Sequence, residues 1–196
     1  MKTHRFVLAA ALPFVLAACA STPSPDKKAA YAAEARTASG ELIKRLVGEL
    51  NDDIAKIGAH GAIGVCKDKA PVIAGEIAKK HGVGIKRVTF KNRNEKRSTP
   101  DAWEADALRA LEKQLASGGD PAKLEHYDIV TGGDGKPYFR YTKGLVIGGL
   151  CMNCHGPKDS LSDAVKAKLA TEYPNDQATG YQLDQFRGAI SITRPL

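Results

Sequence analysis

The sequence lacks a second Cys-x-x-Cys pair, a long apolar run and any internal repeat. Cys66 has no cysteine or histidine two to four residues away, so no second pair of ligands exists for a structural zinc site. The apolar stretch Phe6–Ala18 is too short for a transmembrane helix, which needs about 20 residues. Without the first 18 residues the chain has about 178 residues, a length that suits one domain with a single core.

The charge of the chain is mildly positive and scattered. The formal net charge is +7, from 29 basic and 22 acidic side chains. Removing Lys2 and Arg5 with the first 18 residues leaves 27 basic side chains against 22 acidic ones, a net charge of +5. The densest basic segment, Lys91–Arg97, is typical of a solvated loop. Together with the export signal described next, this pattern argues against nucleic acid as a partner.

Residues 1–18 have the pattern of a signal peptide. Lys2 and Arg5 precede the apolar stretch, which ends in Leu16-Ala17-Ala18-Cys19. This tetrapeptide resembles the lipobox of bacterial lipoproteins, in which the cysteine is acylated and becomes the first residue of the mature protein. The resemblance implies a lipid anchor on Cys19 and a membrane as partner. Ala20 in the next position favours the outer membrane over the inner one, with the domain facing the periplasm.

Two consequences follow for the organisation of the chain. Residues 19–28 are expected to be the lipidated cysteine and a polar, proline-bearing tether, which at about 3 Å per residue spans roughly 25–30 Å. Residues 29–196 are expected to be the folded domain. An ordinary signal peptide cleaved near Ala20 is the alternative to lipidation.

The most informative segment is Cys151-Met152-Asn153-Cys154-His155. Two cysteines three positions apart, followed by histidine, are typical of a c-type haem attachment site. The thiols can add to the two vinyl groups of one porphyrin, and His155 can then bind the iron. A thioredoxin-like disulfide normally opens a helix just after a strand, whereas glycines flank this motif on both sides. The sequence therefore predicts one covalent haem c, which requires the c-type cytochrome maturation machinery as a partner.

Cys66 is the best candidate for the second axial ligand of the iron. If Cys19 carries lipid and the motif cysteines carry thioethers, Cys66 is left alone in a compartment that normally pairs thiols. A thiolate bound to iron explains this, and a buried inert thiol is the alternative. Met152 is held at the porphyrin edge and cannot readily reach the far face. The histidines that compete for the same role are His60, His81 and His126.

Local patterns predict an α+β domain. Apolar residues recur at helical spacing in Ala29–Ile57 and in Ile63–Lys80, and Pro71 either kinks the second helix or marks its first turn. Thr99 is the predicted cap of a helix that starts at Pro100. The pattern of β-branched residues and turns predicts four strands, and a short helix near Ser162–Glu172. The strands are expected at Val83–Phe90, Tyr127–Thr131, Pro137–Thr142 and Phe186–Thr193.

From Cys66 to Leu196 the chain resembles a bacterial family of c-type haem proteins with a PAS-like fold. The resemblance implies a central antiparallel sheet flanked by helices, with a long N-terminal helix. It also implies that His155 and Cys66 hold the haem iron from opposite sides. The segments that carry it are Cys66–Pro71, Gly82–Phe90, Asn92–Asn94, Pro100–Glu104, Cys151–Gly156, Tyr173-Pro174, Gly180-Tyr181 and Arg187–Ser191.

The expected function is that of a periplasmic, lipid-anchored haem protein in redox or ligand sensing or in low-potential electron transfer. A thiolate ligand stabilises ferric iron and lowers its reduction potential. Reduction weakens the iron–sulfur bond, which would open a site for a small gas. A redox protein of unknown identity is the expected partner. The alternatives are a peroxidase-type enzyme, which needs an open distal site with acid–base residues, and a lipoprotein with a structural haem.

Overall fold

A four-stranded antiparallel sheet is the centre of the fold, which a computed structural model describes for residues 24–196. The strands lie in the order β1-β4-β3-β2. Their bounds are β1 Gly84–Val88, β2 Glu125–Thr131, β3 Pro137–Val146 and β4 Phe186–Pro195. The predicted α+β class, with helices on both faces of the sheet, is confirmed, while the finer PAS-like description stays a prediction. The predicted signal peptide and Cys19 lie outside the described residues.

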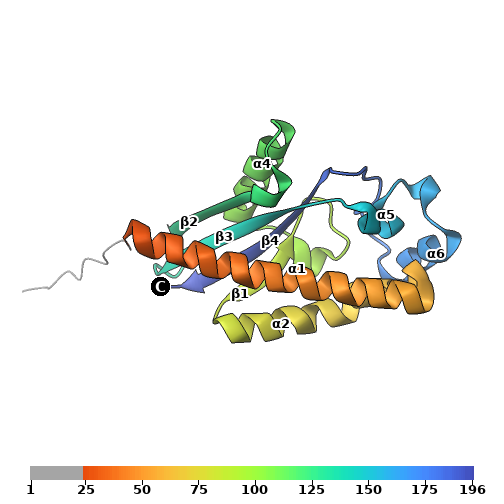
Figure 1. Cartoon of the computed structure of the whole chain (residues 1–196), viewed down its shortest axis with the longest axis horizontal. Helices are drawn as coiled ribbons and strands as arrows, with labels where there is room; N and C mark the ends of the chain where they lie inside the picture. Colours follow the sequence, from red (N-terminus) through yellow and green to blue (C-terminus); the bar gives the residue numbers. More distant parts are fainter. Residues whose placement is uncertain (1–23) are drawn as a thin grey trace, which may run out of the picture.

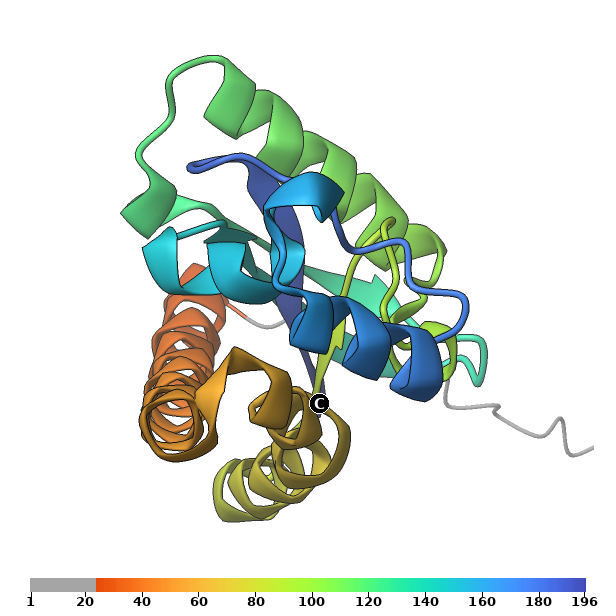
Figure 2. The ribbon, with the colours of Figure 1, turned by 90° about the vertical axis from the view of Figure 1, so that its right-hand side faces the viewer.

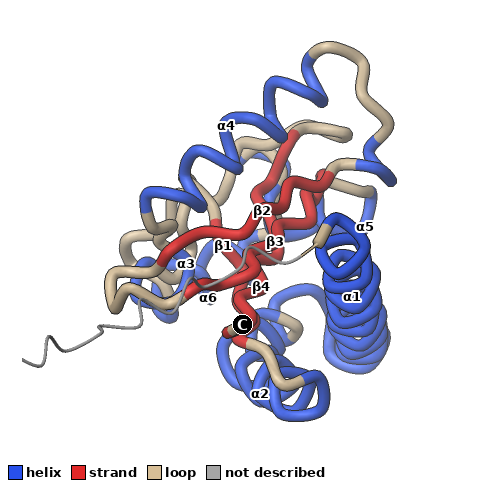
Figure 3. Tube along the Cα trace, turned by 90° about the vertical axis from the view of Figure 1, so that its left-hand side faces the viewer, coloured by secondary structure: helices blue, strands red, loops and turns tan. Residues whose placement is uncertain are grey.

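Helices α1 (Pro25–Gly61) and α2 (Ala70–His81) cover one face of the sheet (Figure 3). The core on this face joins the apolar side of α1 to the centres of β3 and β4. Its fully buried members include Ala32, Ala38, Leu42, Ile77, Phe139, Tyr141, Ile190 and Ile192. Both long helices were expected from the helical spacing of these apolar side chains. Within the described residues, no helix is long and apolar enough to cross a membrane.

The long helix α1 begins earlier than the sequence predicts. It starts at Pro25, so the last four residues of the predicted tether are helical. A proline suits the first turn of a helix because its fixed φ is helical and its missing N–H needs no partner there. Lys28, also placed in the tether, forms an ion pair of 2.7 Å with Asp128 in β2. Contact with the sheet therefore extends the helix beyond what the local sequence indicates.

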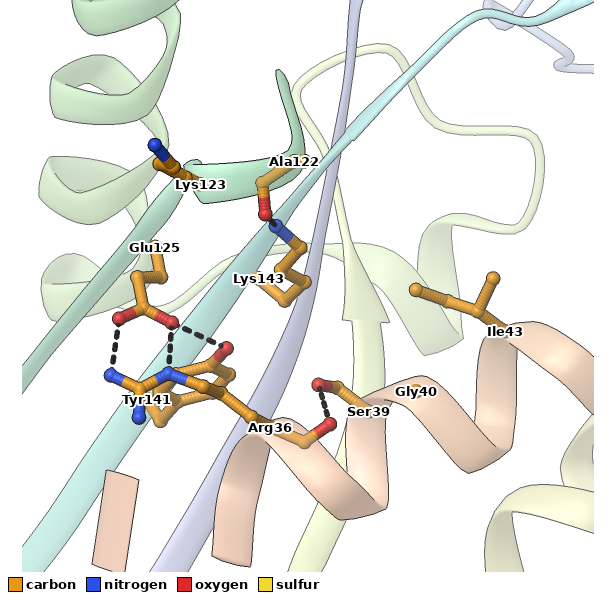
Figure 4. A pocket seen from close by; sticks show the side chains of 9 residues that line it. All are labelled: Arg36, Ser39, Gly40, Ile43, Ala122, Lys123, Glu125, Tyr141 and Lys143. Atoms are coloured by element: carbon orange, nitrogen blue, oxygen red, sulfur yellow. Dashed lines mark hydrogen bonds and ion pairs between the residues drawn. The ribbon is translucent and has the colours of Figure 1, made fainter. Parts of the chain in front are cut away.

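Arg36 joins α1 to the sheet through a polar cluster (Figure 4). Its Nε and Nη2 donate to the two carboxylate oxygens of Glu125 at 2.8 and 2.6 Å. The buried hydroxyl of Tyr141 donates to the same carboxylate at 3.1 Å. The hydrogen bonds from Arg36 hold the pKa of Glu125 below its usual range. Burial, with the charge of Glu125, raises the pKa of Tyr141, so its hydroxyl stays a donor at neutral pH.

Replacing Glu125 with glutamine removes the charge that pairs with Arg36 and is expected to lower the free energy of unfolding by about 1 kcal/mol at pH 7. The effect is modest because the Arg36 side chain is half exposed and solvent screens the pair. Because the pKa of Glu125 is lower in the folded than in the unfolded protein, its charged form stabilises the fold at pH values above the unfolded pKa of about 4.3. This stabilisation is lost as the pH falls through the folded pKa. Urea unfolding at pH 7 and below pH 4 should show the difference between variant and wild type shrinking in acid. A difference that is equal at both pH values would contradict the role of this carboxylate charge.

Helix α4 (Ala102–Ala116) covers the opposite face of the sheet (Figure 3). The predicted cap at Thr99 is wrong, because Thr99 ends the short helix α3 (Glu95–Ser98) and donates to the Glu95 carbonyl. Asp101 caps α4 instead, accepting from the backbone N–H of Glu104 while the Glu104 carboxylate accepts from that of Asp101. This reciprocal capping box satisfies two otherwise free donors.

Glu104 is a fully buried acid that the apolar pattern of α4 did not predict. Its carboxylate accepts from Ser191 in β4 at 2.6 Å. It also forms ion pairs with Lys86 in β1 at 2.9 Å and with Arg140 in β3 at 3.1 Å. One carboxylate therefore ties α4 to three strands.

Helices α5 and α6 lie at the end of the molecule where α1 ends (Figure 1). Figure 2 looks onto this end, with α5 and α6 in front of the sheet. Gly58 has a φ of 77°, which breaks the helical path of α1 and lets the chain turn towards α2. The bounds of the elements near this end are η1 Val65–Lys69, α5 Gly149–His155, η3 Lys158–Ser160 and α6 Asp163–Glu172. The short turn η2, Pro121–Lys123, links α4 to β2 instead.

Candidate functional site

The Cys-x-x-Cys-His motif and Cys66 line one cavity of about 630 Å³. Its walls come from α1, η1 with α2, β1, the end of β3 with α5, and β4. Most of the wall is apolar, and the lining also contains several basic side chains. The apolar lining includes Leu46, Leu50, Ile63, Ala74, Leu145 and Ile190. Residues that are far apart in the sequence thus enclose one space of a size typical for ligand pockets.

The short helix α5 presents the two motif cysteines. Two residues, Ile147 and Gly148, separate it from the end of β3, and the spacing of Cys151 and Cys154 places both on one side of the helix. Both side chains are partly buried, and the Cys154 thiol lies 3.8 Å from the Ala59 carbonyl that it donates to. Burial raises the pKa of the Cys154 thiol; the charge of Arg93 opposes this, and the nearby Cys66 and Cys151 thiols raise the pKa further.

The position of α5 corrects one argument drawn from the sequence. The glycines around the motif were expected to keep it out of a helix that follows a strand, yet α5 follows β3 directly. Gly148 lies in the link between β3 and α5, and Gly149 is the first residue of α5. A thioredoxin-like site is instead disfavoured by the sheet, because β3 is antiparallel to both neighbours and belongs to no βαβ unit.

His155 is the last residue of α5, and its ring is partly buried at the cavity. The Nδ1 atom lies 2.6 Å from the Ala178 carbonyl oxygen, so Nδ1–H donates and Nε2 keeps a free lone pair. Burial holds the pKa of His155 well below its usual range, and the charges of Arg93 and Arg187 lower it further, while the bond to Ala178 opposes them. A neutral imidazole with one free nitrogen is the form that binds metals.

Cys66 lies in η1, a five-residue π-helical turn between α1 and α2. Helical structure runs from Ile63 through this turn into α2, and Pro71 lies in the first turn of α2. Cys66 is therefore neither on a regular α-helix nor in a loop, the two positions considered from the sequence. Such π turns are rare and frequently occur at functional sites.

Ion pairs brace the turn on both sides of Cys66. Lys67 pairs with Glu172 in α6. Lys69 pairs with Glu49 at 2.8 Å and with Asp53 at 3.0 Å, both in α1. The backbone that carries the thiol is thus tied to α6 and to α1, and α1 forms part of the cavity wall.

The three competing histidines lie elsewhere. His60 is in the last turn of α1 and does not line the cavity. His81 ends α2, where its Nε2 lies 3.0 Å from a carboxylate oxygen of Glu41. His126 is in β2 and packs against Trp103 of α4, with ring centroids 5.6 Å apart. None of the three shares the cavity with His155.

The basic segment Lys91–Arg97 is not only a solvated loop. The Arg93 side chain is 8% exposed and pairs at 3.0 Å with Asp176, which is 9% exposed. Sequence reasoning assigned Arg93 no role, although the Asn92–Asn94 motif contains it. The other arginines that line the cavity are Arg87, Arg97 and Arg187.

A family model described as Tll0287-like matches residues 20–195. The chain belongs to the Tll0287-like family. Its fold is similar to that of the cyanobacterial haem protein Tll0287 in a crystal structure, with a TM-score of 0.62 and 19% sequence identity. That match covers 88% of this chain and 97% of the other. No curated protein matches the chain. At this level of identity, the structural likeness to Tll0287 shows a common fold.

Proposed function

We propose that this Tll0287-like protein is a periplasmic, lipid-anchored c-type haem protein that senses redox state or a ligand, or transfers electrons at low potential. The observation that carries the proposal is that Cys66 and the Cys-x-x-Cys-His motif line one cavity. The crystal structure with the similar fold is that of a haem protein, which supports the same choice of cofactor.

The residues around the cavity fit a haem. The walls are mainly apolar, as a porphyrin requires, and both motif thiols lie at the cavity from one side of α5. His155 keeps Nε2 free for iron because Nδ1–H is bonded to a carbonyl. Arg87 and Arg187 supply positive charge that suits the two carboxylates of a haem. The bound haem would supply one-electron chemistry.

Cys66 is the proposed partner of His155 on the iron. The ion pairs of Lys67 and Lys69 connect the backbone next to Cys66 to α6 and α1. A thiolate stabilises the ferric state, so the expected reduction potential is low. Among the described residues, His155 is the one histidine that lines the cavity. This disfavours the peroxidase alternative, which needs a second acid–base group over an open iron site.

The site is proposed to face soluble partners. Because α1 begins at Pro25, five residues at most separate Cys19 from the helix, and a segment of that length can reach no more than roughly 15–18 Å. The α1 residues that line the cavity, such as Leu46 and Ile54, lie roughly 30–45 Å further along the helix at 1.5 Å per residue. If Cys19 carries the lipid, the haem end of the molecule is thus remote from the anchored end of α1, and a soluble redox protein is the fitting partner.

The test is to produce the full chain with the c-type cytochrome maturation machinery and to measure covalent haem. We expect one haem per chain that survives a denaturing gel, with the pyridine haemochrome spectrum of two thioether bonds. The Cys19→Ser variant should keep this haem and lose lipid labelling and membrane association. Absence of covalent haem from the exported wild-type chain would refute the proposed cofactor, and unchanged lipid labelling in the variant would refute the anchor.

A further inference from the structure

Arg93 is a buried cation that contacts the haem motif from a distant part of the chain. Its Nη2 donates to the carbonyl oxygen of Cys154 at 2.6 Å. The same Nη2 donates to the carbonyl oxygen of Ala178 at 3.3 Å. One guanidinium group therefore joins the backbone of the motif to the loop that follows α6.

Asp176 holds this guanidinium in place. Its Oδ2 accepts from Arg93 Nε at 3.1 Å and lies 3.0 Å from Arg93 Nη2. Its Oδ1 accepts from the backbone N–H of Ala178 at 2.8 Å. The Asp176 carboxylate thus fixes both Arg93 and Ala178, whose carbonyl oxygen Arg93 contacts. Both charged side chains are at least nine-tenths buried, so the pair is well shielded from water.

The Ala178 carbonyl oxygen receives two donors. His155 Nδ1 lies 2.6 Å from it, and Arg93 Nη2 lies 3.3 Å from it. The acceptor of this Nδ1–H bond orients a ligating imidazole and sets its basicity. A guanidinium on the same oxygen holds the carbonyl in one direction and withdraws electron density from it. The carbonyl then accepts less strongly from His155, and the imidazole donates less charge to iron.

We infer that Arg93, held by Asp176, is a positioning residue for His155 that orients its imidazole through the shared Ala178 carbonyl and raises the reduction potential of the iron. This inference rests on the proposed function, because it requires iron bound by His155. It explains why two opposite charges are buried beside the motif. It also opposes the effect of the thiolate ligand, so the potential is set by both sides of the site.

The test compares four variants of the full, matured chain by redox titration and by ferric electron paramagnetic resonance. In Arg93→Gln the ratio of ferrous to ferric protein at a fixed potential should fall about tenfold, which is ~59 mV for a one-electron couple. The g values should shift as well, because the imidazole loses its fixed orientation. Arg93→Lys should recover most of the potential, since it keeps the charge, but not the g values, since it lacks the planar fork.

The other two variants separate charge from structure. Asp176→Asn removes a negative charge, so the potential should rise while the g values shift as in Arg93→Gln. Arg109→Gln, on the exposed side of α4, is the matched control and should change neither measurement. If Arg93→Gln does not accumulate, Arg93→Lys and Asp176→Asn carry the test.

Two results would overturn the inference. One is an unchanged potential and spectrum in haem-loaded Arg93→Gln. The other is a fall in potential of the same size in Arg93→Gln, Arg93→Lys and Asp176→Asn, which would make Arg93 a structural latch alone. Haem content is measured first on the wild-type chain, so a failure of the proposed function is recognised separately as missing covalent haem.

Discussion

The Cys66→Ala variant is expected to lose the low-spin ferric signature of a thiolate ligand and to keep its covalent haem. The thiol reaches the cavity from η1, whereas the attachment cysteines and His155 come from α5, so the two functions are separable. Losing a strong anionic donor should also raise the reduction potential, because the ferric state loses its main stabilisation. The measurement is the optical and paramagnetic resonance spectrum of the ferric protein beside that of wild type.

The matched control changes the same turn and spares the thiol. Lys69→Gln removes the ion pairs to Glu49 and Asp53 and should keep the thiolate spectrum. Identical spectra for Cys66→Ala and wild type would make Cys66 a structural thiol and remove the proposed ligand pair. Carbon monoxide adds a second readout, since ferrous wild-type protein should bind it if the weakened iron–sulfur bond opens. A ferrous protein that stays six-coordinate and takes up no gas would refute a ligand switch.

The Glu104→Ala variant is expected to lose about 3 kcal/mol of the free energy of unfolding, because it removes the carboxylate that two cations share. The Arg140 side chain is only 13% exposed and forms ion pairs with Glu104 and with the half-exposed Asp101. Without Glu104, this largely buried cation keeps Asp101 alone as its acidic partner among the described residues. The substitution also removes the Ser191 bond and half of the capping box. Urea denaturation at pH 7 measures the loss.

Two comparisons separate the buried network from general effects on α4. Glu112→Ala, at an exposed position of the same helix, should change stability by less than about 0.5 kcal/mol. Glu104→Gln keeps the shape of the side chain and should lie between Glu104→Ala and wild type. The ferric spectrum of folded Glu104→Ala should match wild type, because no residue of α4 lines the cavity. A loss below 1 kcal/mol would show that the network contributes specificity of packing alone.

Most secondary structure followed from local pattern, and the differences have common causes. The helices at residues 25–61 and 70–81 and all four strands were expected from periodicity. Their ends moved by up to four residues, except that α2 starts at Ala70 rather than Ile63 because the π turn η1 precedes it. The cap of α4 was missed because Thr99 and Asp101 are both good caps, and the chain stays extended through Asp101 before the helix begins at Ala102. Glu104 was missed because a helical pattern of apolar residues gives no sign that an acid will meet cations from two strands.

The sequence by itself determined the chemistry that is possible: one Cys-x-x-Cys-His segment, one further cysteine in the domain, and helices and strands whose apolar faces must be covered. These features are local, so they can be read from residues a few positions apart. Only the tertiary structure decided that Cys66 lies at the same cavity as a motif 85 residues later, and that Arg93 and Asp176 bury their charges beside it. The reason is physical: burial, pairing of charges and sharing of one carbonyl depend on contacts between distant segments, which no local spacing specifies.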